Sequence, residues 1–191
     1  MSIDKSEAAA ALAAADQSSN RSSVLHFYRM NAPIIMMWGA FWMIADLTIL
    51  YAPRAWGASS WVWPAVGMLG GVICGIYYWR ISGARVRPQS RHYYFRMLAT
   101  WLFTFAFVVC AMVIFSPFKW REPHAFFGVL FGALYAINGV WTGWRLTALG
   151  LFMAAGTMAA NSYLGDRDFL LFMGFGCGGA MVLAGFWLRK V

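Results

Sequence analysis

Six apolar blocks, each close to the length of a membrane-spanning helix, dominate this chain and are separated by short polar breaks. A helix needs about 20 apolar residues to cross the ~30 Å hydrocarbon core of a bilayer. The blocks cover residues 33–51, 61–79, 97–115, 125–144, 146–164 and 169–188. Hydrophobic residues make up 61% of the chain and charged residues only 12%, which excludes an ordinary water-soluble domain. We predict an all-α integral membrane protein with six transmembrane helices, arranged as three consecutive helical hairpins.

The first 23 residues are polar or small and precede the apolar blocks. Asp4 and Glu7 have the spacing of a capping box ahead of an alanine run, which predicts a short helix from about Lys5 to Asp16. Residues 17–23 read as a flexible linker, and Pro33 is expected in the first turn of the first membrane helix. The predicted division is therefore a cytoplasmic tail over residues 1–23 and a six-helix transmembrane domain over residues 24–191.

Positive charge is distributed unevenly between the two sides of the predicted bundle. Five arginines and no acidic residue lie between the second and third blocks: Arg80, Arg85, Arg87, Arg91 and Arg96. With the termini and Arg145, this side holds eleven of the fifteen Lys and Arg residues. The positive-inside rule then places both termini in the cytoplasm, and we expect a plasma-membrane protein, most simply in a bacterial inner membrane. The same five arginines could hold the headgroups of anionic membrane lipids.

A repeated turn suggests that two of the hairpins are copies. YAPRAW at residues 51–56 recurs as FSPFKW at residues 115–120, and Gly-Ile-Tyr at 75–77 recurs as Gly-Val-Trp at 139–141, each 64 residues later. Each unit holds two helices, so successive copies would keep the same orientation in the membrane. The third hairpin shares only the ending of the other two. The pattern predicts an internal duplication.

Glycines spaced four residues apart occur in the second, fourth and sixth blocks. Such residues share one helix face and let two helix backbones approach closely, so that dispersion contacts hold the helices together in lipid. The predicted packing glycines are Gly67, Gly71, Gly75, Gly128, Gly132, Gly174 and Gly178. They could pack helices within one chain or form the contact of a homo-oligomer.

Asp46 is the one acidic residue well inside an apolar block. An ionisable group at that depth is costly unless it has a partner or lines a water-filled cavity. Trp42 shares its helix face, Asn161 lies at a comparable depth, and Asn138 lies closer to the cytoplasm. These four residues form the candidate ligand or proton site, and a structural hydrogen bond of Asp46 is the alternative. Tryptophans at the outer turns, Trp63 and Trp120 among them, could line a ligand pocket or simply anchor the helices at the interface.

Several classes of function are disfavoured by what the chain lacks. The histidines His26, His92 and His124 fall outside the six blocks, and the three cysteines form no paired motif, so we expect no haem, no metal site and no other cofactor. No nucleophile with a base, and no pair of acids, can be assembled into a catalytic set, so we expect no enzyme. The net charge of +8 lies mostly at block ends, as membrane topology requires, and does not indicate a nucleic-acid partner.

In size, helix number and topology, the expected architecture resembles the substrate-binding subunits of energy-coupling-factor vitamin transporters. The first helix of that family usually offers two alanines four residues apart to its transport partner, and residues 30–51 hold no such pair. The resemblance thus concerns architecture alone. The first hypothesis is a non-enzymatic membrane protein that acts by association, as a scaffold, accessory or sensory subunit with a protein partner or a second copy. The alternative is a small-solute or proton-coupled transport component that uses Asp46.

Overall fold

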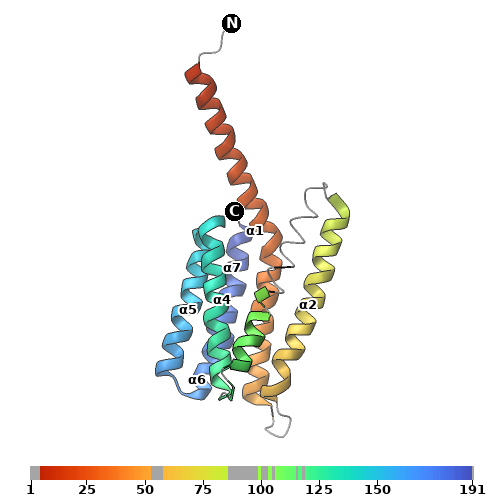
Figure 1. The fold of residues 1–191 in the computed structure, drawn as a ribbon, viewed down its shortest axis with the longest axis vertical. Coiled ribbons are helices and arrows are strands. Elements are labelled where there is room, and N and C mark those ends of the chain that lie inside the picture. The colour runs from red at the N-terminus through yellow and green to blue at the C-terminus, as the bar shows by residue number, and fades with distance from the viewer. Residues whose placement is uncertain are drawn as a thin grey trace. The chain divides into compact units, whose positions relative to one another are not determined.

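The computed structural model describes residues 5–52, 58–85, 99, 103–104, 106–114, 116–117 and 119–190, and these residues are helical with short turns between the helices (Figure 1). The main elements are α1 (Lys5–Tyr51), α2 (Ala58–Arg85), α4 (Arg121–Thr142), α5 (Trp144–Tyr163), α6 (Asp166–Leu171), the π-helix η2 (Phe172–Gly178) and α7 (Gly179–Arg189). No strand occurs among the described residues. The all-α prediction is confirmed.

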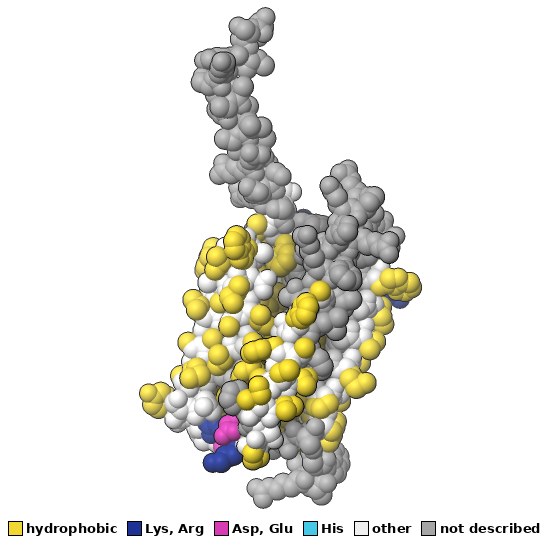
Figure 2. All heavy atoms as spheres, viewed as in Figure 1, with side chains coloured by type: hydrophobic (Ala, Val, Ile, Leu, Met, Phe, Trp, Pro, Cys, Tyr) yellow, Lys and Arg dark blue, Asp and Glu magenta, His cyan; other side chains and the backbone are white. Residues whose placement is uncertain are grey.

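Four helical segments of the described chain are long and apolar enough to cross a membrane: Phe27–Tyr51, Trp61–Arg80, Arg121–Thr142 and Asp166–Arg189. They correspond to the first, second, fourth and sixth predicted blocks. Figure 2 shows hydrophobic side chains spread over the visible face of the described residues, as expected for a surface in contact with lipid. The third block is described in part, at residues 99, 103–104 and 106–114, and these residues are helical. Of the repeated turns, residues 53–56 of the first and residues 115 and 118 of the second lie outside the described residues.

The N-terminal segment differs from its prediction, because α1 continues without a break from Lys5 to Tyr51. The expected linker at residues 17–23 is helical, since extending an existing helix avoids the cost of nucleating a new one. Pro33 lies inside α1 and not in a first turn. It removes one backbone hydrogen bond, a loss that membrane helices tolerate where neighbouring groups compensate. Asn31 donates a hydrogen bond from its amide to the carbonyl of Phe27, 2.9 Å away, in this part of α1.

The chain forms two compact units. Unit 1 holds residues 1–47 and 128–191, with most of α1 and α4 and all of α5, α6, η2 and α7. Unit 2 holds residues 48–127, including α2 and the first turns of α4. The predicted boundary at residue 23 stays a prediction.

Unit 1 is built from antiparallel helix pairs in close contact. A Cβ atom added at Gly132 would lie 2.6 Å from the backbone nitrogen of Ala154, so α4 and α5 touch through their backbones. A Cβ at Gly39 would lie 2.5 Å from the carbonyl oxygen of Gly178, so α1 and η2 also touch through their backbones. Between the helices lies a core that includes Met153, Phe169, Met173, Cys177, Met181 and Leu188.

Candidate functional site

The buried polar centre of unit 1 forms around Asp46 on α1. Its side chain is only 1% exposed, although the surrounding sequence of α1 is apolar. Trp42, one helical turn before it, is also buried and packs edge-on against Phe131 of α4, with ring centroids 5.8 Å apart. The structure therefore places Trp42 and Asp46 on the same inward face of α1, as their spacing implies.

A π-helix faces Asp46. The glycine-rich run of η2 comes within van der Waals distance of it, because a Cβ added at Gly174 would lie 3.4 Å from the Cβ of Asp46. A methyl group at position 174 would therefore be in ordinary van der Waals contact with Asp46. π-Helical turns inside α-helices are uncommon and often occur at functional sites, because they re-aim the side chains of a single turn. Met173 and Cys177 lie in this π-helix, and both side chains are buried in the core.

Thr157 of α5 joins the same centre and is fully buried. Its hydroxyl oxygen lies 3.7 Å from the sulfur of Met173 and 3.6 Å from the sulfur of Cys177. A thioether can only accept, so the Thr157 hydroxyl donates to Met173, whereas between Thr157 and Cys177 either the hydroxyl or the thiol can be the donor. Asp46 is close enough to Cys177 for the two groups to interact electrostatically. We call Asp46, Thr157, Met173 and Cys177 the buried polar centre.

The two asparagines of the predicted site lie elsewhere on their helices. Asn138 is exposed on α4, and its amide donates to the carbonyl of Leu134, 2.8 Å away on the same helix. Asn161 is exposed on α5. The predicted hydrogen bond between Asn161 and Asp46 stays a prediction. Thr157 and Cys177 were not predicted, because a threonine or cysteine within an apolar block carries no signal of its own.

A second buried polar group lies in unit 2. His124 is 7% exposed, and its Nε2 accepts a hydrogen bond of 2.9 Å from the indole N–H of Trp63. Its Nδ1 lies 2.8 Å from the carbonyl oxygen of Trp120, so that nitrogen carries the proton and donates. The imidazole is thus neutral, with both nitrogens engaged. This cluster ties α2 to the start of α4 and fills the space with indole and imidazole rings, which supports an anchoring role for these tryptophans.

The prediction that His124 lies outside the fourth helix was wrong. The fourth helix was expected to begin at Ala125, but α4 begins at Arg121. Pro123 precedes the predicted block but lies in the first turn of α4, where proline is well tolerated because its missing N–H has no partner to lose. The signal that could have placed His124 correctly is the pair Glu122–Pro123, typical of a helix start.

The predicted packing glycines divide into two groups. Those of unit 1 are in contact with other helices: a Cβ at Gly128 would meet Thr157, one at Gly132 would meet Ala154, and one at Gly178 would meet Gly39. Gly174 faces Asp46 and Met43. For Gly67, Gly71 and Gly75 on α2, in contrast, no described atom lies within 4 Å of such a Cβ.

Of the five arginines predicted to bind lipid headgroups, Arg80 lies on α2 and its side chain is exposed. The side chain of Arg85 and all of Arg87, Arg91 and Arg96 lie outside the described residues. No group of three or more His, Cys, Asp or Glu side chains that could hold a metal ion occurs in the described part of the chain. Comparison with known protein families, with curated proteins and with solved structures found no match to this chain.

Proposed function

We propose that this chain is a multi-pass plasma-membrane protein that acts by association and not by catalysis, with α2 as its contact helix. The observation that supports the proposal is the open glycine face of α2, formed by Gly67, Gly71 and Gly75. Large apolar side chains on the same helix, such as Met68, Val72 and Trp79, are exposed as well. Within unit 2, this face of α2 thus has the shape that a second helix needs, and no described atom lies within 4 Å of a Cβ at its three glycines.

The glycines of unit 1 indicate what such a face does in this protein. At Gly39, Gly132 and Gly178, the backbone of a neighbouring segment comes into contact with the glycine. Lipid chains do not need glycines to pack against a helix, whereas a second helix gains dispersion contacts from them. The simplest occupant is α2 of a second copy, because a glycine row is self-complementary about a twofold axis. A scaffold, accessory or sensory role in a membrane complex would use the same surface.

The oligomeric state of the protein in a bilayer tests this proposal. The full-length protein, labelled with donor and acceptor dyes, would be reconstituted into liposomes at several protein-to-lipid ratios and its energy transfer measured. Gly71→Leu fills the glycine face and is expected to weaken association at least tenfold. Val72→Leu, at an exposed position about 100° around the same helix, is the matched control and is expected to change nothing. A monomer at all ratios, or equal effects of both variants, would reject the proposal.

We further propose six membrane crossings with both termini in the cytoplasm. Four segments meet the length and composition of a span, and α5 packs antiparallel along α4, from Gly132 opposite Ala154 to Gly139 opposite Thr147. If α4 crosses the membrane, α5 must cross back, and its 20 residues span about 30 Å. The sixth crossing is the block at residues 97–115, of which 106–114 are helical. The uneven distribution of Lys and Arg supports the orientation.

A second candidate function, transport of a proton or small cation, is favoured by the buried polar centre. A carboxyl group inside an apolar bundle is expensive and marks a site of ion or proton passage in many membrane proteins. Here Asp46 of α1 lies beside the π-helix η2, and Cys177 of η2 contacts the Thr157 hydroxyl of α5. A carboxyl group in such a setting can bind and release a proton.

Measuring proton flux through the purified protein distinguishes proton transport from a purely structural role of Asp46. Proteoliposomes loaded with a pH-sensitive dye would be given a potassium diffusion potential, and proton entry recorded. Asp46→Asn keeps the shape but removes the titrating group, so flux should fall to the level of empty liposomes. Asp168→Asn, which removes an exposed carboxyl outside the buried polar centre, is the matched control and should leave the flux unchanged. Wild-type flux no higher than that of empty liposomes would reject transport of protons.

A further inference from the structure

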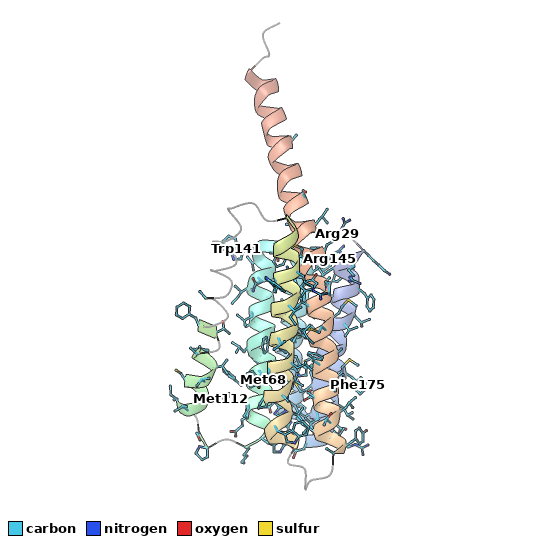
Figure 3. The ribbon with its side chains drawn as sticks, turned by 90° about the vertical axis from the view of Figure 1, so that its right-hand side faces the viewer. Arg29, Met68, Met112, Trp141, Arg145 and Phe175 are labelled. Atoms are coloured by element: carbon cyan, nitrogen blue, oxygen red, sulfur yellow. The ribbon has the colours of Figure 1, made fainter. Side chains whose placement is uncertain are left out.

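One end of unit 1 gathers positive charge from three helices. Arg29 comes from α1, Arg145 from the first turn of α5, and Arg189 and Lys190 from the end of α7. Figure 3 shows Arg29 and Arg145 at the same end of the helices. The acidic side chains described in unit 1 lie elsewhere: Asp46 is in the buried polar centre, and Asp166 and Asp168 follow the opposite end of α5. The described part of this end is thus purely cationic.

Arg145 is held in place by an aromatic pair. Its guanidinium carbon lies 4.7 Å from the centroid of the Trp187 ring, and its Nη1 donates to the carbonyl oxygen of Trp187 over 3.1 Å. Trp144 in turn packs edge-on against Trp187, with ring centroids 5.0 Å apart. The carbonyl of Trp187 belongs to the last turn of α7, where carbonyls lack an intrahelical donor. Arg145 therefore caps α7 with one of its five N–H donors and keeps the others available.

Tyr28 connects this aromatic pair to α1. It is buried, its hydroxyl contacts Gly143 in the turn between α4 and α5, and it lies close enough to Arg145 for an electrostatic interaction. Gly143 has a φ of 131°, a conformation that side chains rarely allow, so the turn can come close to the tyrosine ring. The next residue, Arg29, is exposed. Two arginines from two helices are thus carried on one rigid framework.

We propose that Arg29 and Arg145, with Trp144 and Trp187, bind the phosphate headgroup of an anionic glycerophospholipid. A guanidinium fork matches the geometry of a phosphate and can donate two parallel hydrogen bonds to it. Arg29 lies near the start of the candidate span Phe27–Tyr51 and Trp187 near the end of the span Asp166–Arg189, which is the depth of a headgroup. Trp144 is 67% exposed, as interfacial tryptophans are, and Leu183 and Phe186 on α7 are exposed for the acyl chains. This site is independent of the association proposed for α2.

Native mass spectrometry of the full-length protein tests the site. The protein in a neutral detergent would be titrated with phosphatidylglycerol and, separately, with phosphatidylcholine. Each arginine near an anionic headgroup contributes about 1 kcal/mol, which corresponds to about a fivefold change in affinity. Arg145→Gln and Arg29→Gln should therefore each weaken phosphatidylglycerol binding about fivefold, and the double variant about 25-fold, with phosphatidylcholine binding unchanged. Arg145→Lys keeps the charge but loses the fork, and should fall between Arg145→Gln and the wild type.

The matched control is Arg167→Gln, an exposed arginine between Asp166 and Asp168 at the opposite end of α5. It should leave lipid binding unchanged. Equal losses for Arg167→Gln and Arg145→Gln would overturn the proposal, because diffuse attraction would then explain the binding. Displacement of the lipid by millimolar inorganic phosphate would also overturn it, since the ligand would then be a soluble anion. Arg29→Gln keeps the test valid if Arg145→Gln does not fold, because the exposed side chain of Arg29 has no described contact.

Discussion

Thr157 shows how a single hydroxyl can organise the interior of this bundle. The Thr157 hydroxyl donates to the Met173 thioether, which can only accept, and either partner can be the donor between Thr157 and Cys177. One hydroxyl of α5 thus engages both sulfur atoms of η2. All three side chains are at most 2% exposed, so no water competes for these positions.

Removing that hydroxyl should destabilise unit 1 by a modest amount. Thr157→Val preserves the shape but breaks both hydrogen bonds, and we expect the free energy of unfolding to fall by about 1–2 kcal/mol. In a Cys177→Ala background the same change should cost less, because one of the two bonds is already gone. Unfolding in mixed micelles, followed by circular dichroism, measures both values. Ser162→Ala, which removes an exposed hydroxyl on the same helix, is the control and should stay within about 0.5 kcal/mol. A Thr157→Val loss no larger than that would show that these bonds add nothing.

At the residue scale, the sequence identified Asp46 and Trp42 but could not identify their neighbours. An acid in an apolar block is conspicuous because its burial is costly, whereas threonine and cysteine occur in such blocks for ordinary packing. The neighbours come from α5 and η2, more than a hundred residues away in the chain. Their convergence depends on helix pairing, and no local pattern encodes it.

The helices themselves were largely readable from hydrophobic length, and the errors occurred where local rules compete. Residues 17–23 favour a linker by composition, yet they are helical because they extend α1. The sequence did not reveal the π-helix either. Gly174 and Gly178 predicted packing against another helix, which is present, but their spacing does not show that a turn holds an extra residue. Close packing between α1 and the last helix can be tested directly.

Gly178, at the end of η2, and Gly179, at the start of α7, should differ in how substitution by alanine changes the free energy of unfolding. A Cβ at Gly178 would lie 2.7 Å from the carbonyl oxygen of Gly39 and 3.2 Å from the backbone nitrogen of Met43, neither of which can move aside easily. Gly178→Ala should therefore lower the free energy of unfolding by about 1–3 kcal/mol. At Gly179 no described atom lies within 4 Å, so Gly179→Ala should be neutral or stabilise by up to about 1 kcal/mol. Thermal unfolding in detergent compares the two. Equal shifts would mean that α1 and the last helix are not in backbone contact.

For the whole molecule, the orientation in the membrane links the proposals together. The segment from Asp166 to Arg189 is 24 residues long, or about 36 Å as a helix, and it contains the most apolar 18-residue window of the four candidate spans. If it crosses the bilayer, the cationic end with Arg189 and the mixed-charge end with Asp166 and Asp168 must lie on opposite sides. The positive-inside rule then assigns the cationic end to the cytoplasm, where anionic lipids are available to Arg29 and Arg145.

Labelling of single introduced cysteines decides the orientation. Lys190→Cys and Arg167→Cys replace exposed residues at the two ends of this segment, and the native cysteines Cys74, Cys110 and Cys177 lie in apolar stretches. A membrane-impermeant maleimide should label Arg167→Cys on intact cells, and Lys190→Cys only after permeabilisation, with the unmodified protein as the background. The reverse pattern would place the cationic end outside and remove the link to a cytoplasmic anionic leaflet. Labelling of both from one side would mean that the segment does not cross, and the six-crossing topology would fail with it.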